Sequence, residues 1–406
     1  MTRVERSPVL APAPGGTRPR VAEWISSQPT WARVIGIYAA SRLFTTALLA
    51  ITYLVVTAAH GQVGDSIGTP AFPDFLTMWD SRFYREIAVS GYPARLPLDA
   101  AGNVTENPWA FLPVYPLLVR GLMVTGLDFS IAGPALSLLF GAGSAVVLYW
   151  MLEPRVGSHS ALWAARLFCF APLSFVLQTG YAESLFLFLF LVSVWMLAQQ
   201  HYWLVLPFGL LAAFTRPGAL ALAAAVGIQL IVGLVRRDPV TARTRLAMIV
   251  SGGAILLAGF SWPVIAALVT GYRSAYFDTE LAWWTGYVGR IHFVPMTPWF
   301  LLASRYLGWA GVMLVVGLVV AFLWWLTRPR MRAFGTGVLT TLGAYGAYLV
   351  AVFLPQQSLF RVLLPLSPLL GDPAIARSPA LRRGLLAASI ALQPVAIVLL
   401  WIVIAP

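Results

Sequence analysis

The sequence predicts an all-α polytopic membrane protein. Hydrophobic residues make up 59% of the 406-residue chain and charged residues only 10%. Many apolar runs are long enough to cross roughly 30 Å of hydrocarbon as helices. We therefore predict about 11 transmembrane helices, near 31–57, 131–152, 161–179, 183–200, 203–215, 217–235, 246–270, 299–327, 333–354, 358–372 and 384–404.

The basic residues indicate a membrane topology rather than a nucleic-acid partner. All 27 are arginine, and they give the chain a net charge of +12. In a soluble protein such a charge would be typical of nucleic-acid binding, but in a polytopic protein it is explained by cytoplasmic loops. We expect no nucleic acid as a partner.

The first 30 residues are expected to form a flexible cytoplasmic tail. They hold several prolines and the arginines Arg3, Arg6, Arg18 and Arg20, but no apolar core of a signal peptide. Residues 31–406 would then be a single transmembrane domain, with the N-terminus in the cytoplasm.

The distribution of arginine orients the predicted helices. If the tail is inside, the segments 153–160, 236–245, 328–332 and 371–383 are also inside, which puts the dense arginine clusters on the side that the positive-inside rule requires. This holds only if the apolar stretch 109–127 lies along or dips into the outer leaflet. With Pro113 and Pro116 near its start, a crossing helix there remains the alternative.

Polar residues gather on the predicted outer face. They interrupt the apolar sequence at Asp80, at 178–183, at 215–216, in the loop 271–298 and at 356–361. Ionisable groups at membrane depth are costly and normally face a cavity or a partner. The sequence therefore predicts a site there, built with two long external loops, 58–130 and 271–298.

Asp80 is the leading candidate for chemistry in the first external loop. Trp79, Phe83 and Ile87 recur every four residues, which predicts a short interfacial helix with Asp80 at its start. A carboxylate in that position can take a proton from a sugar hydroxyl, or it can simply cap the helix. The proline-rich and aromatic stretch 107–116 predicts a stiff surface beside the membrane.

Five motifs in order resemble the PIG-V type of mannosyltransferase over roughly residues 30–370. They are WD followed by FYREIAVSGY, then FLPVYPLL, GYAESLF, FTRPGAL and RVLLPLSPLL. The resemblance implies a GT-C fold, an acidic residue in the first external loop, a polyprenyl-phosphate sugar donor and a site on the non-cytoplasmic side. Lysine-free, arginine-rich usage points to a bacterium, and so to its inner membrane.

Carried onto this chain, the resemblance makes Asp80 the catalytic base of a single displacement that inverts configuration. Arg361 and Arg216 would bind the donor phosphate, because guanidinium offers two parallel donors to phosphate oxygens. Arg216 has an alternative as a snorkelling residue where Pro217 breaks a helix. Glu183 would bind sugar hydroxyls or orient an arginine, the alternative being a carboxylate at a helix start.

The remaining candidates are aromatic and polar residues near these motifs. Tryptophans there are also explained as interface anchors. Asp278 and Glu280 are expected to be solvated loop charges, although either could be a second carboxylate. The predicted sugar- or acceptor-binding residues besides Glu183 are Trp79, Tyr84, Tyr115, Tyr181, Gln356, Gln357, Trp283 and His292.

No metal or cofactor is expected. The four histidines are scattered without ligand spacing, and no pair of carboxylates stands close in sequence. The single cysteine, Cys169, cannot form an internal disulfide, and packing is its expected role. The resemblance to enzymes with a lone loop aspartate likewise implies metal independence.

Residues 215–218, Thr-Arg-Pro-Gly, stand where the family has Arg-Ser-Asn-Gly, and this departure leaves the acceptor open. We expect a polyprenyl-phosphate-mannose donor, a glycolipid, wall glycan or protein acceptor, and surrounding membrane lipid. Other polyprenyl-phosphate sugars, a lipid or sugar transporter or flippase, and a non-catalytic scaffold remain alternatives. The sequence predicts no oligomeric state.

Overall fold

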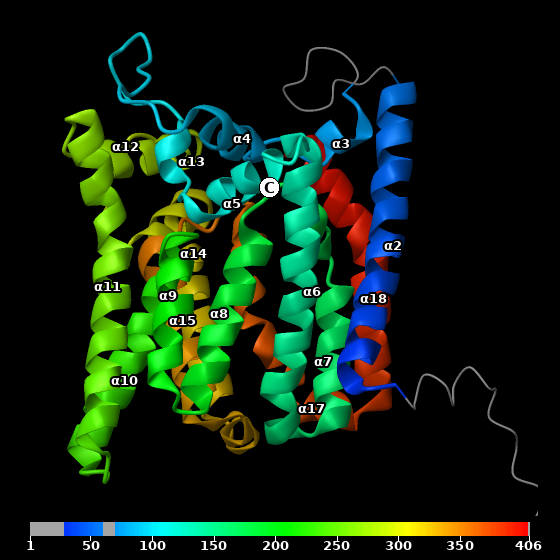
Figure 1. The fold of residues 1–406 in the computed structure, drawn as a ribbon, viewed down its shortest axis with the longest axis vertical. Helices are drawn as coiled ribbons and strands as arrows, with labels where there is room; N and C mark the ends of the chain where they lie inside the picture. The colour runs from blue at the N-terminus through cyan, green and yellow to red at the C-terminus, as the bar shows by residue number, and fades with distance from the viewer. Residues whose placement is uncertain (1–27, 60–69, 405–406) are drawn as a thin grey trace, which may run out of the picture.

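The computed structural model describes residues 28–59 and 70–404, and these residues are almost entirely helical (Figure 1). Within them the only β-type pairing is an isolated bridge between Leu98 and Val104. The prediction of an all-α protein is confirmed. Residues 1–27 of the predicted tail and residues 60–69 of the predicted first external loop lie outside the described residues.

Seven helices in the described part of the chain are long and apolar enough to cross a membrane, which confirms the multi-pass prediction. Three of them are counted with a short helix that adjoins them. The seven are α2 (Thr30–Ala58), α6 (Phe129–Val156), α10 (Leu220–Arg236), α11 (Ala242–Thr270), α14 (Pro298–Thr327), α15 (Gly335–Val352) and α18 (Pro379–Ile397).

Shorter apolar helices fill the middle of the bundle. α6 packs against α7 (Ser158–Cys169) and α8 (Glu183–Ala198), and α8 packs against α9 (Tyr202–Ala213). Most of α8 is buried. A helix that is apolar all round belongs in such an interior, where every face meets another helix.

Two of the predicted spans are divided into separate helices, and a third, α14, is kinked at the non-helical Gly308. The run 161–179 ends as a helix at Cys169, shortly before Pro172, and resumes as the 3-10 helix η2 (Ser174–Gln178). The run 358–372 forms α16 (Leu359–Val362) and the 3-10 helix η5 (Leu364–Gly371), because it contains two prolines. The prediction of about 11 transmembrane helices thus corresponds, in the described residues, to seven long helices together with shorter and broken ones.

A buried arginine donates hydrogen bonds to the backbone at the first of these breaks. Arg42 of α2 donates to the carbonyl oxygen of Cys169 at 2.8 Å, to the carbonyl of Ser174, and to the Ser174 hydroxyl at 2.9 Å. Carbonyls freed at a helix end need such partners in a dry interior. Sequence positions far apart thus stabilise an irregular backbone inside the bundle.

Short helices cover one end of the bundle (Figure 1). The segment 109–127 contains the end of the 3-10 helix η1 (Pro108–Ala110) and one ten-residue α-helix. The α-helix is about 15 Å long, which is too short to cross and agrees with the expectation that the segment does not. The short helices at this end are α3 (Phe72–Phe75), α4 (Ser81–Ser90), α5 (Val114–Met123), α12 (Ala275–Ala282) and α13 (Thr285–Val288).

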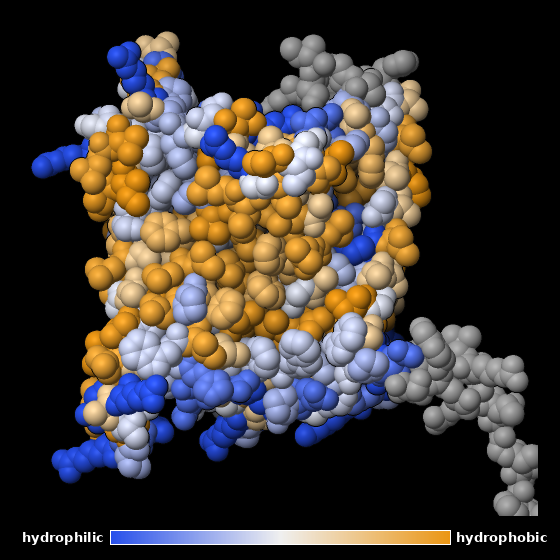
Figure 2. All heavy atoms as spheres, viewed as in Figure 1, coloured by the Kyte–Doolittle hydropathy of each residue, from blue (hydrophilic) through white to orange (hydrophobic). Residues whose placement is uncertain are grey.

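The opposite end carries arginine clusters. The connection from α10 to α11 and the short helix α17 (Pro373–Arg377) lie there in Figure 1, and α2 rises from that end to the α3–α4 end. Figure 2 shows an apolar belt between two more hydrophilic ends. This is the surface expected of a bundle surrounded by lipid.

Candidate functional site

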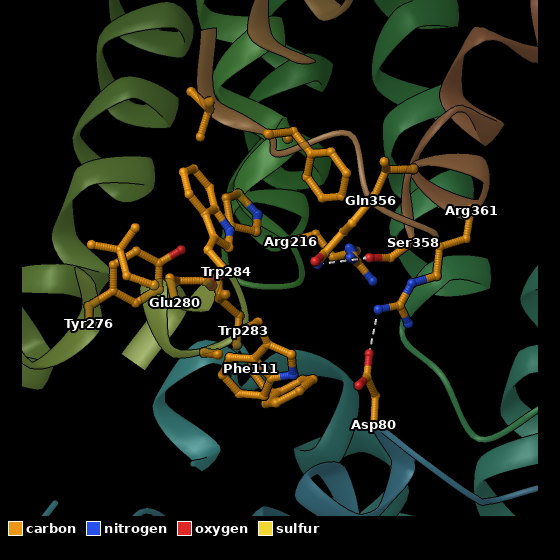
Figure 3. Close-up of a pocket in the computed structure, with 18 of the residues that line it drawn as sticks. Asp80, Phe111, Arg216, Tyr276, Glu280, Trp283, Trp284, Gln356, Ser358 and Arg361 are labelled. Carbon is orange, nitrogen blue, oxygen red and sulfur yellow. Dashed lines mark hydrogen bonds and ion pairs between the residues drawn. The ribbon is translucent and has the colours of Figure 1, made fainter. Parts of the chain in front are cut away.

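A cavity of about 670 Å³ lies between the short helices α4 and α12 and the longer helices of the bundle (Figure 3). Its wall combines the start of α4, the junction of α9 and α10, α11, α12, α15 and the segment 356–361. Eight of the predicted site residues line it, namely Trp79, Asp80, Tyr84, Arg216, Trp283, Gln356, Gln357 and Arg361.

Asp80 directs its carboxylate into this cavity rather than onto its own helix. It precedes α4, but its side chain makes no capping hydrogen bond to the backbone. Instead, its carboxylate accepts a hydrogen bond from Nη2 of Arg361 (Figure 3). The geometry therefore argues against the capping alternative.

Four charged side chains alternate in sign at one side of the cavity, and all of them except Glu183 line its wall. Arg361 contacts Asp80 and also places Nη1 3.3 Å from Oε1 of Glu183. Glu183 forms a second ion pair, with Arg216. The side chains of Asp80, Arg361, Glu183 and Arg216 are each less than one-fifth exposed, so pairing is what makes their burial tolerable.

Part of this network is left unsatisfied. Among the described residues, Nε and Nη1 of Arg361 and Oε2 of Glu183 have no hydrogen-bond partner although they are buried. Buried polar atoms in proteins nearly always find a partner. Nη1 of Arg361 is still in an ion pair with Glu183, so Nε is the donor without any partner in a side chain that lines the cavity.

Arg361 is held from behind by an aromatic ring. Its guanidinium lies over Tyr181, 5.1 Å from the ring centroid. Tyr345 donates to the carbonyl of Val362, the next residue, at 2.7 Å. Stacking and this hydrogen bond orient the guanidinium without using its donors. Tyr181, predicted as a sugar contact, therefore lies beneath Arg361 and not on the cavity wall.

The turn that carries Asp80 is docked onto the 178–183 turn. Ser81 Oγ donates to the carbonyl of Gly180 at 2.9 Å, and the Gly180 nitrogen donates to the Leu76 carbonyl at 3.0 Å. A Cβ at Gly180 would meet Thr77 Cγ2 at 2.8 Å, so only glycine permits this approach. This contact places Asp80 beside Glu183 across about 100 residues of sequence.

Trp79 adds a second restraint on the same turn. Its φ of 57° is in the left-handed region, which is unusual for a bulky residue. Its indole nitrogen donates to the carbonyl of Trp401 at 2.9 Å, and Trp401 lies in the π-helix η6 (Val398–Val403) that ends α18. The last helix of the bundle thus fixes the residue before Asp80.

Three further predicted residues lie away from the cavity wall. Tyr115 is fully buried, with its hydroxyl 3.5 Å from Ser137 Oγ and its ring against Tyr84. Glu183 lies behind the two arginines. His292 is exposed and is not part of the cavity lining, contrary to the expectation that it lines an acceptor groove. The position of His292 in the predicted external loop was not enough to predict whether its side chain reaches the cavity.

Glu280 was expected to be a solvated loop charge, with a second site carboxylate as the alternative. It lines the cavity, so the expectation of a solvated loop charge is wrong for it. Burial raises the pKa of Glu280 to about 7. A hydrogen bond from Tyr276 acts in the opposite direction and has a smaller effect on the pKa. The four-residue spacing of Tyr276 and Glu280 on a helix was the signal that could have found it.

Aromatic rings form the floor between Asp80 and Glu280. Trp283 packs edge-on against Phe83 and Phe111, with ring centroids 5.7 and 5.8 Å apart. Figure 3 shows Trp283 and Trp284 between the two acidic residues. A packed ring platform beside polar groups is suited to the apolar faces of a sugar.

Metal ligation has no obvious place in this arrangement. Within 28–59 and 70–404, no three histidine, cysteine or acidic side chains gather in the manner of a metal site. The expectation of metal independence remains a prediction.

Sequence comparison finds two mannosyltransferases. The chain is 30% identical to GPI mannosyltransferase 2 of Drosophila pseudoobscura pseudoobscura over 124 residues, 28% of this chain and 25% of the relative. It is 30% identical to GPI alpha-1,6-mannosyltransferase 2 of Mus musculus over 143 residues, 32% of this chain and 26% of the relative. The matches span about a quarter of the length of these curated relatives.

No protein-family model matches the chain. Among solved structures, the oligosaccharyltransferase of Archaeoglobus fulgidus aligns with a TM-score of 0.44 and 11% identity, covering 89% of this chain and 52% of that chain. The relationship that the comparisons establish is thus one of sequence: over roughly a third of its length, this chain is similar to two GPI mannosyltransferases.

Proposed function

We propose that this protein is a membrane glycosyltransferase of the GT-C type that moves mannose from polyprenyl-phosphate-mannose to a hydroxyl group. The acceptor would be a glycolipid, a wall glycan or a protein. The observation that carries the proposal is the Asp80–Arg361 pair inside a cavity at one end of an apolar bundle. The partial similarity to two mannosyltransferases supports it.

The two arginines are suited to the phosphate of the donor. A polyprenyl-phosphate sugar is a phosphodiester with one negative charge, and its phosphate gains a second charge when the sugar leaves. Arg361 and Arg216 both line the cavity, and among the described residues Nε of Arg361 is a buried donor without a partner. Guanidinium groups that meet this growing charge stabilise the transition state more than the bound donor.

Asp80 would act as the general base. The acceptor hydroxyl gives its proton to the Asp80 carboxylate as its oxygen forms a bond to the anomeric carbon. The bond from that carbon to the phosphate oxygen breaks, and polyprenyl phosphate leaves with the electron pair. Attack opposite to the leaving group inverts the configuration at the anomeric carbon.

The ion pair between Asp80 and Arg361 couples donor binding to this step. A donor phosphate competes with Asp80 for the guanidinium of Arg361. When Arg361 turns to the phosphate, the Asp80 carboxylate loses its partner and can accept a hydrogen bond from the acceptor hydroxyl instead. The base would thus be released only when a donor is present.

The cavity would face the non-cytoplasmic side of a bacterial inner membrane. The arginine-rich connections lie at the opposite end of the bundle from the cavity. The positive-inside rule assigns that arginine-rich end to the cytoplasm. Donor, acceptor and lipid would then meet at the outer surface.

Transfer of labelled mannose tests the proposal. Purified protein in proteoliposomes would receive polyprenyl-phosphate-[14C]mannose together with lipid and wall fractions of a bacterial membrane. Label that moves with wild type and not with Asp80→Asn supports the proposal and identifies the acceptor fraction. Equal transfer by both proteins removes Asp80 as the base, and the absence of transfer by wild type contradicts the mannose donor.

A further inference from the structure

Helix α12 forms a second wall of the cavity, facing the Asp80–Arg361 pair. Tyr276, Glu280 and Leu281 of α12 line the cavity, and Trp283 and Trp284 follow directly. Figure 3 places Glu280 and Trp284 on one side and Asp80 with Arg361 on the other. The space between these two sides is where a transfer would take place.

The α12 wall is held rigidly against the first external loop. Asn107 Nδ2 donates to Thr279 Oγ1 at 2.8 Å, and Thr279 is fully buried. Trp262 of α11 donates from its indole to the Trp109 carbonyl at 3.0 Å, next to the Asn107 turn. Glu280 follows Thr279, so its position is set by the same contacts. A polar group fixed in this way is pre-organised for a ligand.

Glu280 differs electrically from the other acidic residues of the cavity. Asp80 and Glu106, the other acidic residues that line the cavity, are each paired with an arginine, whereas among the described residues Glu280 has no ion pair within 4.0 Å and has a hydrogen bond to Tyr276. The other titratable groups that act on it are Arg216, Asp80 and Tyr348. Its carboxylate is therefore free to accept hydrogen bonds from a neutral ligand.

We propose that the α12 wall is the acceptor-glycan subsite, in which Glu280 accepts a hydrogen bond from a sugar hydroxyl beside the ring of Trp284. The inference rests on the proposed glycosyltransferase function. It assigns the two sides of the cavity by charge: the arginine side takes the phosphate of the donor, and the carboxylate side takes the neutral acceptor sugar. A phosphate beside Glu280 would be repelled, while sugar hydroxyls are hydrogen-bond donors that a carboxylate binds well.

The protonation of Glu280 gives this subsite a pH dependence with a defined sign. Burial raises the pKa of Glu280 to about 7, so the carboxylate is mostly neutral at pH 6 and mostly ionised at pH 8. The ionised form is the stronger hydrogen-bond acceptor. Glycoside binding is therefore expected to tighten roughly 5- to 10-fold from pH 6 to pH 8.

The test is a binding titration of methyl α-D-mannoside onto the full-length protein in nanodiscs. Binding is detected by saturation-transfer NMR at pH 6 and at pH 8. Glu280→Gln keeps the shape of the side chain and removes its charge, and should weaken binding at pH 8 roughly 10-fold while abolishing the pH dependence. The matched control is Asp278→Asn. Asp278 lies on the same helix, accepts from Ser274 Oγ at 2.6 Å and does not line the cavity, so this variant should bind like wild type.

The outcomes separate this inference from the proposed function. Wild-type binding by Glu280→Gln, or no saturable binding to wild type, overturns the subsite. In a turnover assay, loss of kcat with unchanged acceptor KM would also overturn it, because Glu280 would then act on the reacting hydroxyl. The donor is followed separately, through the shift of the thermal unfolding midpoint with polyprenyl-phosphate-mannose. If the donor does not shift the thermal unfolding midpoint of wild type or of either variant, the proposed function fails. The glycoside titration still decides whether the subsite exists.

Discussion

Arg361 donates a hydrogen bond to the carboxylate of Asp80, joining two residues that are 281 positions apart in the chain. The proposed base and the proposed phosphate ligand are therefore partners before any substrate arrives. Each keeps the other's buried charge tolerable, and a phosphate that takes Arg361 changes the environment of Asp80. The predictions below follow from this network and its supports.

Asp80→Asn should lower mannose transfer on the order of 10²- to 10⁴-fold, because the amide cannot accept the proton of the acceptor hydroxyl. Arg361 keeps Glu183 as a partner in this variant, so folding should be retained. Transfer rate and thermal unfolding midpoint, measured in the same proteoliposome preparation, check both parts. A variant that transfers at the wild-type rate would exclude Asp80 from proton transfer.

Arg361→Lys should lower kcat/KM for the donor roughly 10- to 100-fold. Lysine keeps the positive charge but loses the planar pair of donors that a phosphate or carboxylate engages. Arg330→Lys is a matched control, because Arg330 also pairs with a buried carboxylate, Asp372, outside the cavity lining. Steady-state kinetics with varied donor would show the difference, and equal losses in both variants would argue against phosphate binding by Arg361.

Glu183→Gln should destabilise the protein by about 1–3 kcal/mol. The change leaves Arg216 and Arg361 with one carboxylate between them and removes the charge that bridges the two guanidinium groups. The measurement is the thermal or denaturant midpoint in detergent. Asp128→Asn, at an exposed position that makes no side-chain cap, should be near neutral, and a Glu183 variant just as stable as this control would contradict the proposed pairing.

Trp79→Phe should reduce kcat by roughly 10-fold with a stability loss of only about 1 kcal/mol. Phenylalanine keeps the aromatic contact but cannot donate to the Trp401 carbonyl, so the Asp80 turn loses one of its restraints. Trp150→Phe, on α6 and away from this cavity, controls for the loss of an indole. If both variants behave alike in turnover, the Trp79–Trp401 bond does not position Asp80.

Removal of divalent metal should leave transfer unchanged. In the proposed reaction two arginines, rather than a metal, meet the charge of the leaving phosphate. Transfer would be assayed with and without EDTA, followed by dialysis against Mg²⁺ or Mn²⁺. Activity that is lost with EDTA and restored by either ion would contradict a metal-independent mechanism.

Local features of the chain were enough to predict much of the site. Asp80, Arg216 and Arg361 interrupt apolar sequence at places where a charge is costly unless it has a function. The arginine clusters also predicted that 109–127 does not cross, and the ten-residue length of α5 agrees with this. These predictions depended only on composition and on position along the chain.

Other parts of the prediction failed because they depend on neighbours in space. Hydropathy sees an apolar run at 161–179 or 358–372 but not the break within it, which a distant side chain such as Arg42 makes tolerable. Glu280 and His292 are in the same predicted loop, yet only Glu280 lines the cavity. The composition of the loop does not indicate which of these two residues faces the cavity.

The sequence by itself determined that this chain is an apolar, multi-pass helical protein, with arginine clusters on one predicted face and a group of polar candidate site residues on the other. Those properties follow from transfer free energies, which each residue carries wherever it lies. Only the tertiary structure decided that Asp80 pairs with Arg361, that Glu183 joins two arginines and that Glu280 faces them across a cavity. Such relationships depend on distances between segments that are far apart in sequence, and the packing of the helices sets those distances.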